Sequence, residues 1–180
     1  YEKANIDELR LKSQIKEIKG IKNFQDNKTI LVVDDIKENR DLIVQLLGFY
    51  GFKTLEANSG LMALEVFEKQ NENEKIDLIF MDILMEELDG LETIKIIRKQ
   101  EKNSNVPIIA LSANVFEEDK KEAINAGAND FLPKPVEEKD ILLILKKYLH
   151  IEFEYEEKEE KNDITQELKN LSKEFLQKLN

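Results

Sequence analysis

The sequence predicts an α/β fold with a doubly wound parallel sheet, flanked by N- and C-terminal helices. Residues 29–150 alternate five short apolar runs with five segments of helical periodicity, which is typical of successive β-α units. The apolar runs contain few polar residues, as strands buried on both faces should. Right-handed crossovers between such units place helices on both sides of the sheet.

Local boundary residues support this division. Ser59 is expected to cap the second helix, because a serine hydroxyl accepts from the first free N–H groups of a helix. Gly51 and Gly127 follow helical segments and are expected to end them in the left-handed conformation. The expected strands are 29–33, 52–57, 76–81, 106–111 and 128–132. The expected helices are about 36–49, 59–70, 91–99 and 116–125, with a last one ending near 149.

Composition limits the classes of function. The 180 residues include no cysteine, which excludes disulfides and thiolate metal sites, and the net charge of −11 argues against binding nucleic acid. We find no apolar run of membrane-spanning length and no signal peptide, so we expect a cytoplasmic protein without membrane contact by this segment. The chain begins with Tyr1 rather than Met, and we expect it to be a piece of a longer protein.

Polar residues stand where the expected strands end. Asp34 and Asp35 end the first strand, Asp82 ends the third, Ser112 ends the fourth and Lys134 lies just past the fifth. Because ligands of doubly wound sheets bind beyond the carboxyl ends of the strands, we expect these groups on one rim. A single acidic strand end commonly only caps a helix, but this combination indicates a site.

Three carboxylates in one crevice favour a hard divalent cation. Mg²⁺ prefers oxygen ligands and is commonly held by one or two carboxylates and a phosphate oxygen, which leaves one acid free as a nucleophile. Phosphoryl transfer spreads charge over three oxygens, and the Lys134 ammonium and the Ser112 hydroxyl would share it with the cation. We also expect a cis peptide bond between Lys134 and Pro135.

Four strings in residues 29–150 carry a family resemblance: LVVDD (31–35), MDILMEELDG (81–90), ALSAN (110–114) and NDFLPKP (129–135). With these strings, residues 29–150 resemble the receiver domain of two-component response regulators. The stretch DDIKENR (34–40) looks most like the receivers of hybrid sensor histidine kinases. The resemblance implies a flavodoxin-like fold with strand order 2-1-3-4-5 and a phosphoryl group accepted on Asp82 from a histidine kinase or a histidine phosphotransfer protein.

The resemblance also implies a role for each site residue. Ser112 and Lys134 would bind the phosphoryl oxygens. Ser112 and Phe131 match the switch pair, in which the hydroxyl moves toward the phosphate and the aromatic ring turns inward. The implied Mg²⁺ ligands are Asp34, Asp35, Asp82 and the backbone carbonyl of Leu84.

Three positions depart from the usual pattern. Phe131 lacks the hydroxyl of the tyrosine found in many relatives, which excludes a hydrogen-bonded signal from the tip of the ring. Glu86 stands where a proline is common, so we expect a less rigid loop with an added negative charge. Leu84 offers no group to orient an attacking water, and we expect slow self-dephosphorylation.

Amphipathic patterns mark both flanks. Residues 1–28 are expected to form a helical linker, with apolar residues at helical spacing up to Ile21, either in a coiled coil or folded against the receiver. Residues 151–180 are expected to form an acidic connector and an amphipathic helix that begins at a capping box of Asp163 and Gln166. The linker helix, the receiver surface, a missing domain or a second copy of the chain in a homodimer remain candidates to cover that helix.

The expected function is a phosphoacceptor switch of a two-component phosphorelay, as a fragment of a hybrid histidine kinase or a multi-domain regulator. We expect no independent enzyme activity beyond self-phosphorylation from small donors and self-dephosphorylation. A stand-alone regulator acting by protein–protein interaction is the alternative. A haloacid-dehalogenase-like phosphatase needs an Asp where Leu84 stands, and the glycine-rich loops of nucleotide-binding folds are missing. His150, the only histidine, is read as the end of a helix rather than a relay site.

Overall fold

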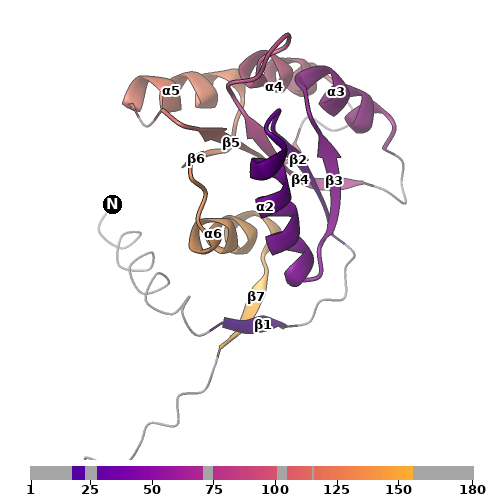
Figure 1. Ribbon diagram of the computed structural model, residues 1–180, viewed down its shortest axis with the longest axis vertical. Helices are drawn as coiled ribbons and strands as arrows, with labels where there is room; N and C mark the ends of the chain where they lie inside the picture. The colour runs from indigo at the N-terminus through magenta and orange to yellow at the C-terminus, as the bar shows by residue number, and fades with distance from the viewer. Residues whose placement is uncertain (1–17, 23–27, 71–74, 101–104, 115, 156–180) are drawn as a thin grey trace, which may run out of the picture.

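The computed structural model describes residues 18–22, 28–70, 75–100, 105–114 and 116–155. Its centre is a five-stranded parallel sheet in the order β3-β2-β4-β5-β6 (Figure 1). Numbered within the sheet alone, this order is 2-1-3-4-5, as the family resemblance implies. The strands are β2 (Thr29–Val33), β3 (Lys53–Ala57), β4 (Ile76–Asp82), β5 (Ile108–Ser112) and β6 (Asp130–Pro133).

Helices cover both faces of this sheet, which makes a three-layer, flavodoxin-like α/β fold (Figure 1). One face is covered by α2 (Lys37–Phe49) and α6 (Glu138–Leu149). The other face is covered by α3 (Gly60–Glu68), α4 (Gly90–Lys99) and α5 (Glu117–Ala126). The prediction of a doubly wound parallel sheet is confirmed.

Two apolar clusters hold the layers together, one on each face of the sheet. Strand β2 is fully buried, and its alternate side chains divide between the clusters, with Leu31 on one face and Ile30 on the other. Phe67 of α3 fills the first cluster, and Leu47 of α2 fills the second. Each such side chain contributes about 1.5–3 kcal/mol on burial.

The predicted boundary residues are found in their predicted roles. The Ser59 hydroxyl accepts from the backbone N–H of Met62 at 3.2 Å and so caps α3. Gly51 and Gly127 have positive φ values, of 86° and 113°, after α2 and α5. The peptide bond between Lys134 and Pro135 is cis. Element ends agree with the prediction to within two residues.

A two-stranded antiparallel ribbon, which the sequence reading missed, closes the α2–α6 side of the domain (Figure 1). It pairs β1 (Ile18–Lys22) with β7 (Glu152–Tyr155). Phe153 is only 4% exposed in the α2–α6 cluster, and Ile18 and Ile21 pack against that cluster. The predicted helix through Ile21 is therefore wrong for residues 18–22, as is the solvated connector for residues 152–155.

The cause of the first error is the spacing of Ile18 and Ile21. A separation of three residues is typical of one helix face, whereas strand residues on one face are two apart. The register of β1 shifts between Ile18 and Gly20, and this irregularity lets both isoleucines lie against the cluster. In β7, by contrast, buried Phe153 between exposed Glu152 and Glu154 follows the period of a strand.

The remaining predictions for the flanks, including the helix expected from Asp163, fall on residues 1–17 and 156–180 and lie outside the described residues. His150 stands directly after α6, as predicted, and has a left-handed backbone with φ of 54°. Among the described residues, the helices are too short and too polar to cross a membrane.

Candidate functional site

Backbone hydrogen bonds between neighbouring strands continue past the strand ends. They hold the backbone at the predicted site residues in place. The N–H of Asp34 donates to the carbonyl of Ala57 at 3.2 Å, and the N–H of Lys134 donates to the carbonyl of Ser112 at 2.8 Å. The residue after Asp82, Ile83, donates in the same way to Leu111 at 3.0 Å. These bonds hold three separate loops at one edge of the sheet.

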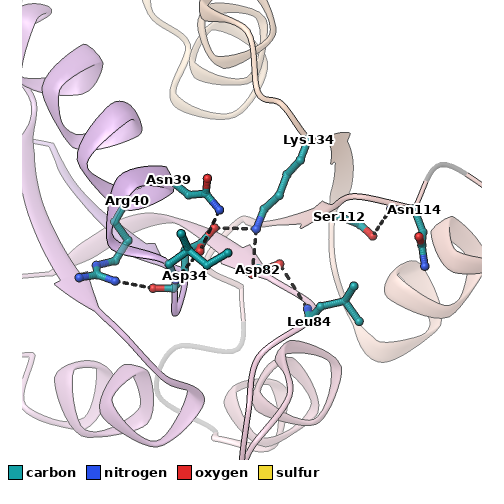
Figure 2. Close-up of polar contacts among 9 residues, drawn as sticks. Asp34, Asn39, Arg40, Asp82, Leu84, Ser112, Asn114 and Lys134 are labelled. Atoms are coloured by element: carbon teal, nitrogen blue, oxygen red, sulfur yellow. Dashed lines mark hydrogen bonds and ion pairs between the residues drawn. The ribbon is translucent and has the colours of Figure 1, made fainter.

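At that edge, three carboxylates face one another. Oxygens of Asp34, Asp35 and Asp82 all lie within 4.8 Å of each other. Asp34 is fully buried, Asp82 is 3% exposed and Asp35 is exposed. The ammonium of Lys134 lies between the two buried acids, 2.6 Å from Oδ2 of Asp34 and 2.8 Å from Oδ2 of Asp82 (Figure 2). The sequence prediction that these four residues meet is confirmed by these distances.

Burial shapes the electrostatics of this cluster. Desolvation raises the pKa of the Asp82 carboxyl, and the negative charge of Asp34 adds to it, although Lys134 and the N–H of Leu84 act in the opposite direction. Burial alone would lower the pKa of Lys134, but the hydrogen bonds and charges of the two acids outweigh it, so this pKa is raised. Lys134 therefore stays charged between the acids.

The donor set fits a hard divalent cation. The site has one ammonium for three carboxyl groups, two of which, Asp34 and Asp82, are buried. Negative charges are costly to bury without a partner. The oxygen ligands and the charge of the site match the preferences of Mg²⁺.

Asp34 is held by more donors than Lys134 alone. Its Oδ1 accepts from the backbone N–H of Ile36 at 2.9 Å and from the side-chain amide of Asn39 at 3.2 Å. The guanidinium of Arg40 donates to the backbone carbonyl of Asp34 at 2.7 Å (Figure 2). Asn39 and Arg40 lie in the string DDIKENR (34–40), which indicated the family, but these contacts were not predicted. Their position in the first turn of α2, facing back to the strand end, is the signal that was available.

The loop after β4 is fixed by a close backbone approach. The N–H of Leu84 donates to Oδ1 of Asp82 at 3.2 Å, while the Leu84 side chain is 60% exposed. A Cβ atom on Gly90 would lie 2.0 Å from the backbone oxygen of Asp82, so only glycine lets α4 begin this close to the strand end. Asp89 caps α4 by accepting from Glu92 N–H at 2.8 Å.

Beside the carboxylates lies a cavity of about 320 Å³ that is lined in part by Asp35, Leu84 and Ser112. Ser112 is buried, and its hydroxyl accepts from the backbone N–H of Asn114 at 3.0 Å (Figure 2). Phe131 lies apart from this wall, on β6, where its half-buried ring packs against the cluster under α3, α4 and α5. We call the cluster of Asp34, Asp35, Asp82 and Lys134 the cup. Ser112 lies next to the cup, and Phe131 packs against the adjoining core.

A family model and curated relatives indicate the same family for this chain. The family model described as the response regulator receiver domain matches residues 30–146. Hybrid signal transduction histidine kinase L of Dictyostelium discoideum is 38% identical over 122 residues, which are 66% of this chain and 7% of the kinase. Sensor histidine kinase RcsC of Escherichia coli K12 is 35% identical over 111 residues, 62% of this chain and 11% of the kinase. The chain therefore spans only a small share of these relatives' length.

A solved structure shares the fold. The receiver domain of sensor histidine kinase PA1611 from Pseudomonas aeruginosa has a TM-score of 0.63 and 33% identity, covering 69% of this chain and 99% of that one. That receiver domain has a magnesium ion coordinated in its active-site cleft.

Proposed function

The chain belongs to the response regulator receiver domain family, and on that premise we propose that it is a phosphoacceptor switch, with Asp82 as the acceptor. The donor is a phosphohistidine of a histidine kinase or a histidine phosphotransfer protein. In the transfer, the P–N bond of the phosphohistidine breaks and a carboxylate oxygen of Asp82 forms the new O–P bond. The departing imidazole keeps the electron pair of the broken bond and takes up a proton.

The observation that carries this proposal is the cup of charges at the strand ends. Asp82 is buried beside a second buried acid, and one ammonium contacts both at 2.6 and 2.8 Å. A purely structural ion pair needs one acid and one base, whereas this cluster has an excess of carboxylate. That excess suits a site that receives a cation and then a phosphoryl group.

Asp34, Asp35 and Asp82 would hold Mg²⁺, together with the backbone carbonyl of Leu84. When bound, the ion supplies positive charge for the phosphoryl oxygens and removes the repulsion among the acids. Lys134 would move its contact from the carboxylates to a phosphoryl oxygen, for which its raised pKa keeps it charged. The Ser112 hydroxyl borders the adjacent cavity and is placed to take another oxygen by leaving the N–H of Asn114.

We further propose that the switch is a cytoplasmic segment of a hybrid sensor histidine kinase. The likeness to the receivers of the Dictyostelium kinase and RcsC supports this origin. The change at Ser112 would reach partners through Phe131, because that ring packs in the core that adjoins α5 and β6. The surface formed by α5, β6 and α6 is then the output surface.

The test is phosphorylation of the purified chain with acetyl phosphate, with and without Mg²⁺. We expect the wild type to gain the mass of one phosphoryl group only when Mg²⁺ is present, and the Asp82→Asn variant to gain none. Glu68→Gln, at an exposed acid of α3, serves as the control and should be labelled like the wild type. Equal labelling of the wild type and the Asp82→Asn variant would refute the proposal.

A further inference from the structure

Asp34 is unusual among the three acids because donors on α2 already hold both its side chain and its backbone. Its Oδ1 is taken by the N–H of Ile36 and the amide of Asn39, at 2.9 and 3.2 Å. Its Oδ2 is the oxygen that contacts the ammonium of Lys134, at 2.6 Å. The two oxygens of one carboxylate are thus divided between α2 and the cup (Figure 2).

Arg40 fixes the backbone from which this carboxylate projects. One guanidinium nitrogen donates to the carbonyl of Asp34 at 2.7 Å, and Nε lies 3.4 Å from a carboxylate oxygen of Glu56 on β3. The Arg40 side chain is only 12% exposed, so it is packed into this position. Arg40 thereby ties the end of β2 to the neighbouring strand.

We propose that Asn39 and Arg40 are positioning residues for the cation site, which together hold Asp34 so that Oδ2 alone points into the cup. This inference rests on the proposed function and extends it to two residues that do not themselves touch the cation. Without the Asn39 amide, only the N–H of Ile36 holds Oδ1, so the orientation of the Asp34 carboxylate is less fixed. Part of the binding energy of Mg²⁺ is then spent on fixing it again. Outer-shell partners of metal ligands commonly change metal affinity by about 10–100-fold.

The test compares Asn39→Leu with the wild-type chain, because leucine branches at Cγ as asparagine does but has no donor. Calorimetric titration with Mg²⁺ at neutral pH should give a dissociation constant about tenfold higher for the variant. In the acetyl phosphate reaction, the half-saturating Mg²⁺ concentration should rise by the same factor. The rate at saturating Mg²⁺ should stay near that of the wild type, since a positioning residue is not needed once the ion is bound.

Two further variants make the result specific. Gln45→Ala removes an exposed amide from the same helix and should leave the Mg²⁺ affinity unchanged. Arg40→Lys keeps the positive charge but lacks the planar fork that reaches Asp34 and Glu56 together, so it should weaken Mg²⁺ binding several-fold. If charge alone mattered, Arg40→Lys would bind Mg²⁺ like the wild type, and the role assigned to Arg40 would be overturned.

The outcomes separate this inference from the proposed function. If the wild type binds Mg²⁺ and is labelled, but Asn39→Leu has the same Mg²⁺ affinity, the positioning role is wrong and the proposed function stands. If Asn39→Leu loses its maximal rate with no shift in the half-saturating Mg²⁺ concentration, its role is structural and the inference is also wrong. If the wild type neither binds Mg²⁺ nor is labelled, both fall.

Discussion

At the scale of single residues, the site is built on an incomplete balance of charge. Asp34 and Asp82 are both buried, and Lys134 contacts both. One ammonium cannot neutralise two carboxylates, and the exposed Asp35 adds a third negative charge nearby. The folded chain without a bound cation therefore carries an electrostatic cost at this point.

That cost predicts how stability depends on pH. The pKa of Asp82 is raised in the folded chain, mainly by burial, so the folded state holds the proton more tightly than the unfolded state. Stability from this group is present below its unfolded pKa and is lost as the pH rises through the higher folded pKa. In Mg²⁺-free buffer, Asp82→Asn should therefore melt a few degrees above the wild type at neutral pH.

The gain must shrink as the pH is lowered, because protonated Asp82 no longer carries the charge that asparagine removes. Thermal melts of both proteins between about pH 4 and pH 8 measure this difference, since that range extends upward from the ordinary carboxyl pKa. The exposed acid substitution Glu68→Gln corrects for the change in net charge. A gain that is constant, or that grows toward low pH, would contradict the prediction.

Part of this arrangement of residues could be predicted from the sequence. Strand-end positions were enough to predict that Asp34, Asp82 and Lys134 meet, because parallel strands end at one edge. The contacts of Asn39 and Arg40 were not predictable in the same way. They depend on the rotamers of two side chains on α2 and on the angle at which that helix leaves the strand, and a sequence pattern fixes neither.

At the scale of elements, α4 and α5 are joined away from the site by Arg98. Its guanidinium donates to the carbonyls of Gly127 and Val106 at 2.7 and 2.8 Å, and to the side chain of Asn129 at 2.6 Å. Asn129 in turn accepts from the N–H of Ile108 at 2.9 Å. One half-buried side chain thus joins the last turn of α4, the end of α5 and the starts of β5 and β6.

Removing this side chain should destabilise the fold without reaching the site. We predict that Arg98→Met lowers the free energy of unfolding by about 2–4 kcal/mol, because the partly buried carbonyls of Gly127 and Val106 lose the guanidinium donors. Urea unfolding followed by circular dichroism measures this loss. Lys99→Met, at the exposed neighbour, is the matched control and should change little. An Arg98→Met variant as stable as that control would show that the network is not stabilising.

Element order and type were predictable because the residues within each β-α unit indicate where its strand and helix begin and end. Apolar runs of strand length, the hydroxyl of Ser59 and the positive-φ glycines Gly51 and Gly127 act within a few residues of chain. The requirement for glycine at position 90 is different in kind. It comes from the backbone oxygen of Asp82, which a Cβ atom would meet at 2.0 Å, and that approach exists only in the folded chain.

At the scale of the whole molecule, the ribbon of β1 and β7 extends the receiver beyond its five β-α units. It pairs residues 18–22 with residues 152–155, which are the first and last described strands along the chain. Its buried side chain Phe153 completes the apolar cluster between α2 and α6. The boundaries of 29 and 150 expected from the sequence therefore leave out two strands that pack on the same core.

If the ribbon is part of this core, its loss should lower the stability of the whole domain. Phe153→Ala should lower the free energy of unfolding by about 3 kcal/mol, as for other buried aromatic side chains. Glu154→Ala, at the exposed neighbour on the same strand, should have little effect and serves as the control. Cooperative urea unfolding, monitored by circular dichroism, distinguishes the two. Equal stability of both variants would mean that the ribbon lies on the domain without supporting it.

The sequence could not reveal this ribbon in full, for a physical reason. Residues 18–22 and 152–155 pair on a surface that the folded β-α units leave open. The local propensity of either segment gives no information about that surface. The alternation around Phe153 was a usable indication for β7. The irregular register at Ile18 disguised β1 as a helix.

The most direct measurement identifies the residue that carries the phosphoryl group. The chain is incubated with acetyl phosphate and Mg²⁺ and then reduced with borohydride, which converts an aspartyl phosphate to homoserine, and the modified peptide is sequenced by mass spectrometry. We predict homoserine at position 82 and at no other aspartate, dependent on Mg²⁺. Modification at a different aspartate, or none in a chain that binds Mg²⁺, would contradict the assignment of Asp82 as the acceptor.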